Sequence, residues 1–204
     1  MITMLSIDAT TMAERDAYKF LIGSIIPRPI AFVTTLSEKG VLNAAPFSYF
    51  NVVSSNPPMV SISIGRMNGI QKDTARNAVY RKAFVVHICD ELNIEAINQT
   101  SAHLPADVSE VDIVGLTPVL STSIEVPGVK ESKIRMECEL ERSIPLGTDD
   151  TSCDLLIGRV LRFHIDEDLF QNGRIDPMKL KPVSRLAGSN YSTLGRIFSL
   201  VRPK

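Results

Sequence analysis

The strongest constraint on the fold is a strict alternation of apolar and charged side chains between positions 134 and 141. One face carries the apolar residues Ile134, Met136, Cys138 and Leu140, and the other carries the charged residues Arg135, Glu137, Glu139 and Glu141. A period of two residues predicts a β-strand with one buried and one solvated face. We therefore expect solvation, rather than catalysis, to be the role of the three glutamates.

Other strand signals come in clusters that turns separate. Residues 30–36 form a β-branched run that stops at 37–40, and Val41 resumes it directly. This pattern predicts a hairpin in which Gly40 adopts a positive φ. Further strands are expected over 59–64, over 84–89 and, after a turn at 147–150, over 153–165. The 84–89 run is apolar nearly throughout, so we expect it to be buried on both faces.

Helical signals are fewer than strand signals. They cover residues 13–21, residues 74–81 after a start signal in Asp73, and residues 91–99. Because helices do not alternate regularly with strands, a doubly wound parallel sheet is disfavoured, and the pattern predicts an α+β domain with a mainly antiparallel β-barrel or sandwich. With no internal repeat and no linker, residues 1–204 are expected to form a single domain.

Charge and hydropathy exclude several classes of protein. Lys and Arg number 22 against 23 Asp and Glu, so the basic excess of a duplex nucleic-acid binder is missing. No apolar run approaches the ~18 residues of a membrane span, and the first residues lack a signal-peptide pattern, so we expect a cytoplasmic location without a membrane partner. Cys89, Cys138 and Cys153 are irregularly spaced and suit buried free thiols.

Familiar catalytic and metal-binding motifs are missing from the sequence. His87, His103 and His164 lie far apart without a cysteine pair, so we expect no metal site. The nucleophile elbow GxSxG, the phosphate loop GxxxxGK[ST] and the dinucleotide fingerprint GxGxxG do not occur. These absences disfavour the common α/β hydrolases, the P-loop NTPases and the Rossmann dehydrogenases.

The tripeptide Lys72-Asp73-Thr74 stands between the 59–64 strand and the following helix. Asp73 or Thr74 can cap that helix, whose first-turn N–H groups and positive dipole end attract an anion beside Lys72. This arrangement suits a phosphate monoester, with the Thr74 hydroxyl as a donor. An ordinary capped helix with an exposed lysine explains the same residues, and local sequence alone favours this simpler interpretation.

Small residues and a proline interrupt the strand-like region at 43–48, with the sequence NAAPFS. Pro46 cannot donate to a sheet ladder, which places it at an edge or a break of the sheet. A flat heteroaromatic ring suits such a surface, because backbone donors are accessible and side-chain bulk is small. A tight bend in a barrel wall is the alternative, and the segment by itself does not choose between them.

A family resemblance emerges when the segments are taken in order. They are PRPIAFVTT (27–35), NAAPFSYFNVVSSNPP (43–58), KDTARN (72–77), AFVVHI (83–88), VDIVGLTPV (111–119), MECEL (136–140), IGRVLRFHID (157–166) and VSRLAGSNY (183–191). Together they resemble the flavin reductase-like family, near its branch with flavoredoxins and the flavin-reductase component of nitrilotriacetate monooxygenase. The resemblance implies the family's FMN-binding split β-barrel.

The resemblance also implies roles for individual residues toward FMN. The ring or ribityl contacts would be Thr34 and Thr35, the polar-edge contacts Ala45, Phe47 and Ser48, and the phosphate contacts Ser63, Arg66, Lys72 and Thr74. Asp73 would cap the helix and order the phosphate loop rather than contact the phosphate, because two anions repel. Arg185 and Tyr191 would approach the site from the C-terminal segment. With these neighbouring motifs counted, the phosphate interpretation of Lys72 becomes the favoured one.

Two interpretations stay open for each of two further residues. His164 lies in a strand motif where the family often has a histidine near the flavin, and it would stack on nicotinamide or meet the charge of reduced flavin. A strand histidine bonded to a neighbour explains it equally well. Arg28, between two prolines, is either a flavin or nicotinamide contact or a tie for its loop.

The function that the resemblance implies is an NAD(P)H-dependent flavin reductase, an FMN oxidoreductase that supplies reduced flavin to a monooxygenase or another electron acceptor. FMN would lie at a homodimer interface. Hydride transfer between stacked rings is mainly a positioning problem, so no catalytic acid–base pair is expected. Two alternatives stay open: an FMN-retaining electron-transfer flavoprotein similar to flavoredoxin, and a non-catalytic flavin-binding module.

Overall fold

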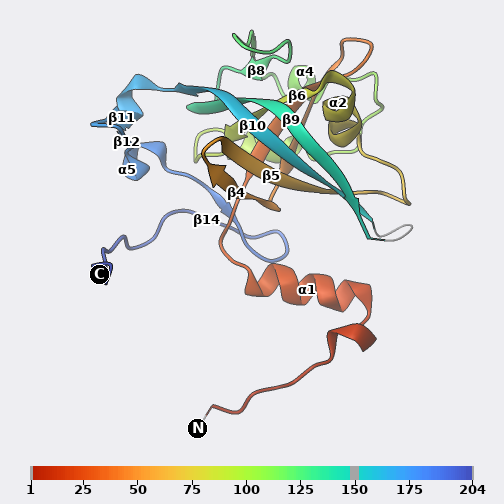
Figure 1. The fold of residues 1–204 in the computed structure, drawn as a ribbon, viewed down its shortest axis with the longest axis vertical. Coiled ribbons are helices and arrows are strands. Elements are labelled where there is room, and N and C mark those ends of the chain that lie inside the picture. Colours follow the sequence, from red (N-terminus) through yellow and green to blue (C-terminus); the bar gives the residue numbers. More distant parts are fainter. Residues whose placement is uncertain (1, 148–151, 204) are drawn as a thin grey trace.

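A seven-stranded antiparallel sheet forms the centre of the computed structural model, which describes residues 2–147 and 152–203 (Figure 1). Its order is β3-β2-β6-β9-β10-β5-β4. The strands are β2 (Ala31–Leu36), β3 (Leu42–Phe47), β4 (Phe50–Ser55), β5 (Pro58–Gly65), β6 (Ala83–Ile88), β9 (Ile134–Leu146) and β10 (Cys153–Ile165). The mainly antiparallel architecture confirms the predicted fold class.

Short strands and helices surround this sheet. A three-stranded sheet joins β1 (Arg28–Pro29), β13 (Ser184–Arg185) and β14 (Tyr191–Ser192), and two pairs join β7 (Pro118–Val119) to β8 (Gly128–Val129) and β11 (Phe170–Gln171) to β12 (Arg174–Ile175). The helices are α1 (Glu14–Ser24), α2 (Asp73–Arg81), α3 (Ile94–Gln99), α4 (Glu110–Ile113) and α5 (Pro177–Leu180), with 3₁₀ turns at Ala9–Thr11 and Glu167–Leu169.

Several predicted elements are confirmed. The 30–42 region is a hairpin, and Gly40 has a φ of 82°. Strand β6 is buried on both faces, and β10 spans the predicted residues 153–165. In the turn predicted at 147–150, residues 148–150 lie outside the described residues.

Helix boundaries differ from the predictions by up to three residues. Helix α1 extends three residues beyond the predicted end, to Ser24. Helix α3 begins at Ile94 rather than at residue 91, because the Asp90 carboxylate accepts hydrogen bonds from the N–H groups of Leu92 and Asn93. These bonds hold residues 90–93 in a turn ahead of the helix.

The hydrophobic core has two main parts. One part packs α2 through Ala75 and Ala78 against the central strands, and it includes Phe84, Leu156 and Ile62. The other part packs α3 and α4 against β2 and β3. Gly158 is required at a register shift in β10, because a Cβ at this position would overlap the buried ring of Phe84. Of the three free thiols, Cys89 and Cys138 are buried as predicted, whereas Cys153 is half-buried.

The prediction for Glu137 is wrong. Its side chain is 1% exposed, and its carboxylate accepts hydrogen bonds from the backbone N–H groups of Thr122 (2.7 Å) and Ser123 (2.6 Å). The segment before β8 therefore covers this part of the strand face. Glu139 and Glu141 stay on the solvated part of that face, where each forms an ion pair with Arg159.

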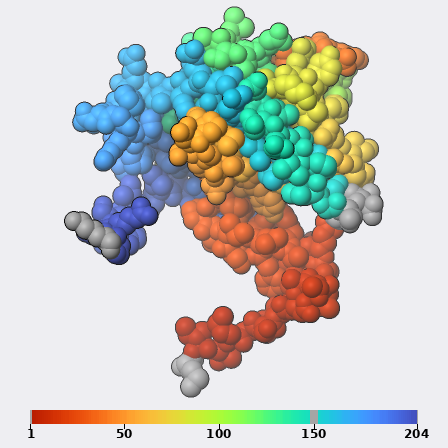
Figure 2. All heavy atoms as spheres, viewed as in Figure 1, coloured from red at the N-terminus to blue at the C-terminus, as the bar shows by residue number. Residues whose placement is uncertain are grey.

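Helix α1 and both terminal segments project from the central sheet (Figures 1 and 2). Ile22 is the sole buried residue of α1, although the helix carries several other apolar side chains. Within the described ranges, none of the helices has the length and apolar character needed to cross a membrane.

Candidate functional site

Two adjoining hollows along strand β3 form one groove. The first, with a cavity volume of about 250 Å³, is lined by Arg28 and Arg185, and we call it the arginine hollow. The second, of about 330 Å³, is lined by Lys72, and we call it the lysine hollow. Pro46 and Phe47 line both hollows, so the end of β3 separates them.

Strand β3 lies at an edge of the sheet, as the position of Pro46 predicted. The amide of Ala44 points away from β2 and donates to Glu110 Oε2 at 3.0 Å. Amide direction alternates along a strand, so Pro46 occupies the next outward position, where its missing N–H breaks no ladder bond. Ala45 lines the lysine hollow with a small side chain, whereas Ala44 is fully buried in the core.

A buried polar network supports the lysine hollow from beneath. Asn43 Oδ1 accepts hydrogen bonds from the hydroxyls of Thr35 (3.1 Å) and Thr74 (3.0 Å). Asn43 Nδ2 donates to both carboxylate oxygens of Glu110, each at 3.1 Å. Asn77 Nδ2 extends the network by donating to the Thr35 hydroxyl. The network thus joins β2, β3, α2 and α4 at one point.

The first turn of α2 lies at one end of the lysine hollow. The N-cap residue is Lys72, and within the described chain no side chain accepts a hydrogen bond from this turn as a cap. The prediction that Asp73 or Thr74 caps the helix is therefore wrong. The Asp73 carboxylate instead forms an ion pair with Arg76, one helical turn later, and Thr74 donates inward to Asn43. First-turn N–H groups and Lys72 together make this end of the hollow favourable for an anion.

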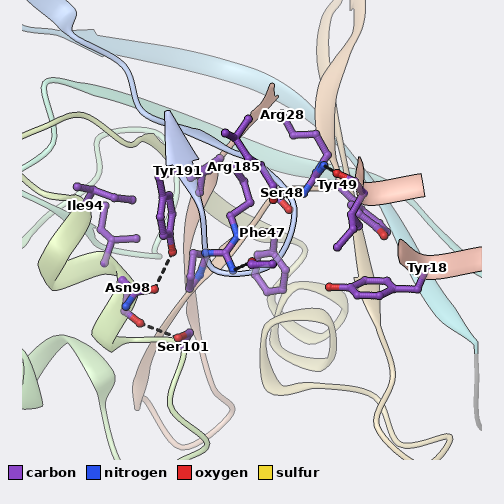
Figure 3. A pocket seen from close by; sticks show the side chains of 16 residues that line it. Tyr18, Arg28, Phe47, Ser48, Tyr49, Ile94, Asn98, Ser101, Arg185 and Tyr191 are labelled. Carbon is purple, nitrogen blue, oxygen red and sulfur yellow. Dashed lines mark hydrogen bonds between the residues drawn. The ribbon is translucent and has the colours of Figure 1, made fainter. Parts of the chain in front are cut away.

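The arginine hollow combines two cations with aromatic side chains from different elements (Figure 3). Its aromatic residues are Tyr18 of α1, Phe47 of β3, Tyr49 and Tyr191 of β14. The Arg185 guanidinium lies 4.4 Å from the centre of the Tyr191 ring. The Tyr191 hydroxyl donates to Asn98 Oδ1 at 2.7 Å, which holds the ring in place.

Arg28 ties three segments together at the back of the arginine hollow. Nη1 donates to the carbonyl oxygens of Ile22 (2.7 Å) and Ile25 (2.6 Å) at the end of α1, and Nη2 donates to that of Leu186 (3.0 Å). A cation at a helix C-terminus also interacts favourably with the helix dipole. The predicted role as a loop tie is confirmed, while the predicted ligand contact stays a prediction.

Tyr49 is held as a neutral phenol in this hollow. Burial raises its pKa, the neighbouring Tyr18 raises it further, and the Arg28 charge opposes both effects only in part. A neutral hydroxyl keeps its proton and so remains a hydrogen-bond donor at neutral pH.

The structure brings most of the predicted site residues into the groove and leaves others outside it. Those that line the groove are Ala45, Phe47, Ser48, Lys72, Asp73, Thr74, Arg185 and Tyr191, together with Arg28. Those that do not are Thr34, Thr35, Ser63, Arg66 and His164. Their roles toward FMN stay predictions.

Three of the side chains outside the groove, those of Thr34, Arg66 and His164, already have partners within the chain. Thr34 is fully buried and donates to the carbonyl oxygen of Pro127 at 2.7 Å. Arg66 binds both oxygens of the buried Asp154, at 3.0 and 2.7 Å. His164 Nε2 lies 2.5 Å from Glu137 Oε1 and lines a separate surface hollow.

Sequence reasoning missed several residues that line the groove. They are Tyr18, Tyr49, Asn98, Ser101 and Glu110. The segment 101–110 carries little family resemblance, yet its two ends contribute Ser101 and Glu110. One local signal was available: Ser109 three residues before Asp112 is a helix start signal, and its hydroxyl accepts from the Asp112 amide. This signal locates α4 but not the burial of Glu110.

Metal-ligating side chains do not gather in this groove. Across residues 2–147 and 152–203, no three or more His, Cys, Asp or Glu side chains come together as metal ligands would.

Comparison with known proteins gives consistent matches over most of the chain. The model of the flavin reductase like domain matches residues 22–179. The uncharacterised protein YwrF of Bacillus subtilis is 53% identical, covering 98% of this chain and all of that protein.

Two solved structures agree with this result. Nitrilotriacetate monooxygenase component B from Bacillus cereus is 56% identical with a TM-score of 0.96, covering 98% of this chain and 100% of that one. The Pseudomonas fluorescens 2-nitrobenzoate 2-nitroreductase NbaA is 30% identical with a TM-score of 0.88, covering 98% and 96%.

Proposed function

Because the chain belongs to the flavin reductase-like family, with its split-barrel fold, we propose that it binds FMN in the groove and reduces it with a hydride from NAD(P)H. The observation that carries this proposal is the lysine hollow, where Lys72 stands at an α2 first turn that no described side chain caps. The same hollow is lined by the edge strand β3, where Ala45 adds little side-chain bulk. We further propose that residues 1–204 act as one flavin-binding domain.

The residues of the groove fit FMN at both of its chemically distinct ends. A phosphate dianion suits the positive end of α2 and the Lys72 ammonium, and Arg76 lines the same hollow. A flat ring system suits the edge of β3, where Phe47 offers an apolar side chain and Ser48 a hydroxyl. The Glu110 carboxylate repels a bound anion less strongly than a free carboxylate would, because it accepts three hydrogen bonds from N–H donors.

Bound FMN would supply the hydride acceptor, and the chain's residues would bind and orient it. Lys72 and the α2 first turn fix one end of the groove, while the network around Asn43 keeps β3 and α2 in register. The neutral Tyr49 phenol is a donor available beside the ring end. Positioning of this kind accounts for reduction without an acid–base pair.

The most similar solved structure above suggests a destination for the electrons. A chain 56% identical to a component B of nitrilotriacetate monooxygenase is expected to supply reduced flavin to a monooxygenase partner. The similarity to NbaA, a 2-nitrobenzoate 2-nitroreductase, supports a reductase function at a lower identity of 30%.

A second copy of this chain is the proposed partner of its projecting segments. The accessible surface is 13097 Å², roughly 3,600 Å² above the ~9,500 Å² expected of a compact monomer of this mass. This excess is larger than the ~1,000–2,500 Å² that each protomer of a permanent homodimer buries. Exposed apolar side chains on these segments include Tyr18, Phe20, Leu21, Ile25, Ile197 and Phe198.

The proposed reduction is tested by anaerobic mixing of the FMN-loaded protein with NADH and, separately, with NADPH. We expect the flavin absorbance to bleach much faster than that of free FMN with at least one of the two donors. Bleaching no faster than free FMN with either donor would contradict the reductase function. FMN that survives exhaustive dialysis but does not bleach would favour the electron-transfer flavoprotein instead.

A further inference from the structure

Arg28 and Arg185 lie directly opposite each other in the antiparallel pair of β1 and β13. Like charges at such positions repel, and both side chains line the arginine hollow. In the described part of the chain neither arginine forms an ion pair. Their hydrogen-bond acceptors are backbone carbonyl oxygens, those of Ile22, Ile25 and Leu186 for Arg28 and that of Gly188 for Arg185.

Arg28 is 6% exposed, and its buried Nε has no hydrogen-bond partner. A buried guanidinium without an opposing charge costs free energy, and the α1 dipole offsets only part of one charge. The hollow therefore holds two positive charges that the described chain leaves without a carboxylate. A bound anion would neutralise them.

The shape and chemistry of the hollow select among anions. Tyr18, Phe47, Tyr49 and Tyr191 surround the cations, so the walls suit a planar aromatic molecule (Figure 3). Tyr191, fixed by Asn98, stacks on Arg185 and so restrains the guanidinium. A restrained guanidinium can bind a carboxylate through paired N–H bonds.

We propose that the arginine hollow is a binding site for a planar aromatic carboxylate, the class of second substrate that would meet FMN in the groove. This inference rests on the proposed function, which supplies the bound FMN and assigns its phosphate to the lysine hollow. Phe47, which lines both hollows, marks the place where the two ligands would adjoin. Arg185 is the specificity-determining residue of this site.

Calorimetric titration of the full chain with benzoate, and with neutral benzamide as the matched ligand, tests this site in FMN-free and FMN-loaded protein. We expect benzamide to bind at least about tenfold more weakly than benzoate. Arg185→Gln should weaken benzoate binding by roughly ten- to a hundredfold and leave benzamide binding unchanged, whereas Arg185→Lys should restore part of it. Arg174→Gln, at an exposed arginine of β12, is the control and should change neither.

Variants of Arg28 would also release α1, so Arg185 carries the test, and circular dichroism checks that each variant is folded. Equal binding of benzoate and benzamide would overturn the proposal. It would also be overturned if Arg185→Gln weakened NADH binding but not benzoate binding, because the cations would then serve the nicotinamide donor.

FMN binding, followed by quenching of flavin fluorescence, separates the two proposals. Protein that binds FMN but not benzoate overturns the aromatic-carboxylate site and leaves the proposed function intact. Protein that does not bind FMN contradicts the proposed function, while benzoate titration of the FMN-free chain still decides the arginine site.

Discussion

Nε2 of His87 accepts a hydrogen bond from the backbone N–H of Val129 at 2.9 Å. Because this nitrogen is an acceptor, the neutral ring carries its proton on Nδ1, which lies 3.0 Å from the carbonyl oxygen of Phe32 and donates to it. The fully buried imidazole thus joins β2, β6 and β8. Protonation of Nε2 would break the bond to Val129.

This arrangement predicts a loss of stability in mild acid. Burial lowers the pKa of His87 from 6.5 to about 3. Below pH 6.5 the unfolded chain binds a proton that the folded chain does not, so the free energy of unfolding falls as the pH drops toward 3. Between pH 7 and pH 5 we expect a decrease of about 2 kcal/mol from His87, measured by urea unfolding.

Two histidine variants isolate this effect. His87→Gln should lower stability at pH 7 but flatten the dependence between pH 5 and pH 7. His103→Gln changes an exposed histidine and should keep the wild-type slope. Equal slopes in all three proteins would assign the acid sensitivity to other groups.

Glu110→Gln is expected to destabilise the protein by about 1–3 kcal/mol. The carboxylate of Glu110 accepts three hydrogen bonds, from Asn43 Nδ2 to each oxygen and from the Ala44 amide. A glutamine amide would place its own NH₂ group against one of these donors and leave it unsatisfied. Thermal unfolding measures the change, and FMN affinity should fall with it because β3 loses its support.

The matched control is Glu95→Gln, which makes the same change at an exposed position of α3. We expect its unfolding temperature and FMN affinity to match the wild type. Equal unfolding temperatures for the Glu110 and Glu95 variants would contradict a supporting role for Glu110.

His164→Ala should reduce stability by about 1–2 kcal/mol without changing FMN affinity. The ring nitrogen lies 2.5 Å from the buried carboxylate of Glu137 and outside the groove. Burial raises the pKa of Glu137, but bonds from Thr122, His164 and Ser123 together lower it below its ordinary value. A loss of FMN affinity at unchanged stability would instead support the flavin contact predicted from the family motif.

Local sequence patterns predicted the elements whose determinants are local. The alternation after Ile134, the hairpin at Gly40 and the strand ending at Ile165 depend on neighbours a few residues away, and all three are present. Alternation also predicted which face Glu137 occupies. Whether that face is covered depends on Thr122 and on the segment around it. The periodicity within the strand carries no information about that segment.

The predictions for the site divide in the same way, between features with local determinants and features that depend on distant residues. Apart from the buried Ala44, the motif at 43–48 lines the groove, as does Lys72, because edge strands and helix starts have local signatures. Asp73 was misassigned because Arg76, three residues later, competes with the first-turn amides for its carboxylate. Asp154, whose carboxylate pairs with Arg66, lies 88 residues further along the chain. This ion pair forms only when β5 pairs with β10 in the folded sheet.

Lys72→Ala should weaken FMN binding by about 1–3 kcal/mol if the ammonium meets the phosphate. The side chain is exposed, so its removal costs little stability, and screening by salt should reduce the difference from wild type. Fluorescence titration with FMN at low and high ionic strength measures both effects. Lys39→Ala removes an equally exposed lysine from the 37–40 turn, outside the groove, and should bind FMN as the wild type does. Titration with riboflavin, which lacks the phosphate, should show no difference between Lys72→Ala and Lys39→Ala. If Lys72→Ala binds FMN as tightly as Lys39→Ala, the lysine hollow is not the phosphate site, and α2 is an ordinary helix with an exposed lysine at its start.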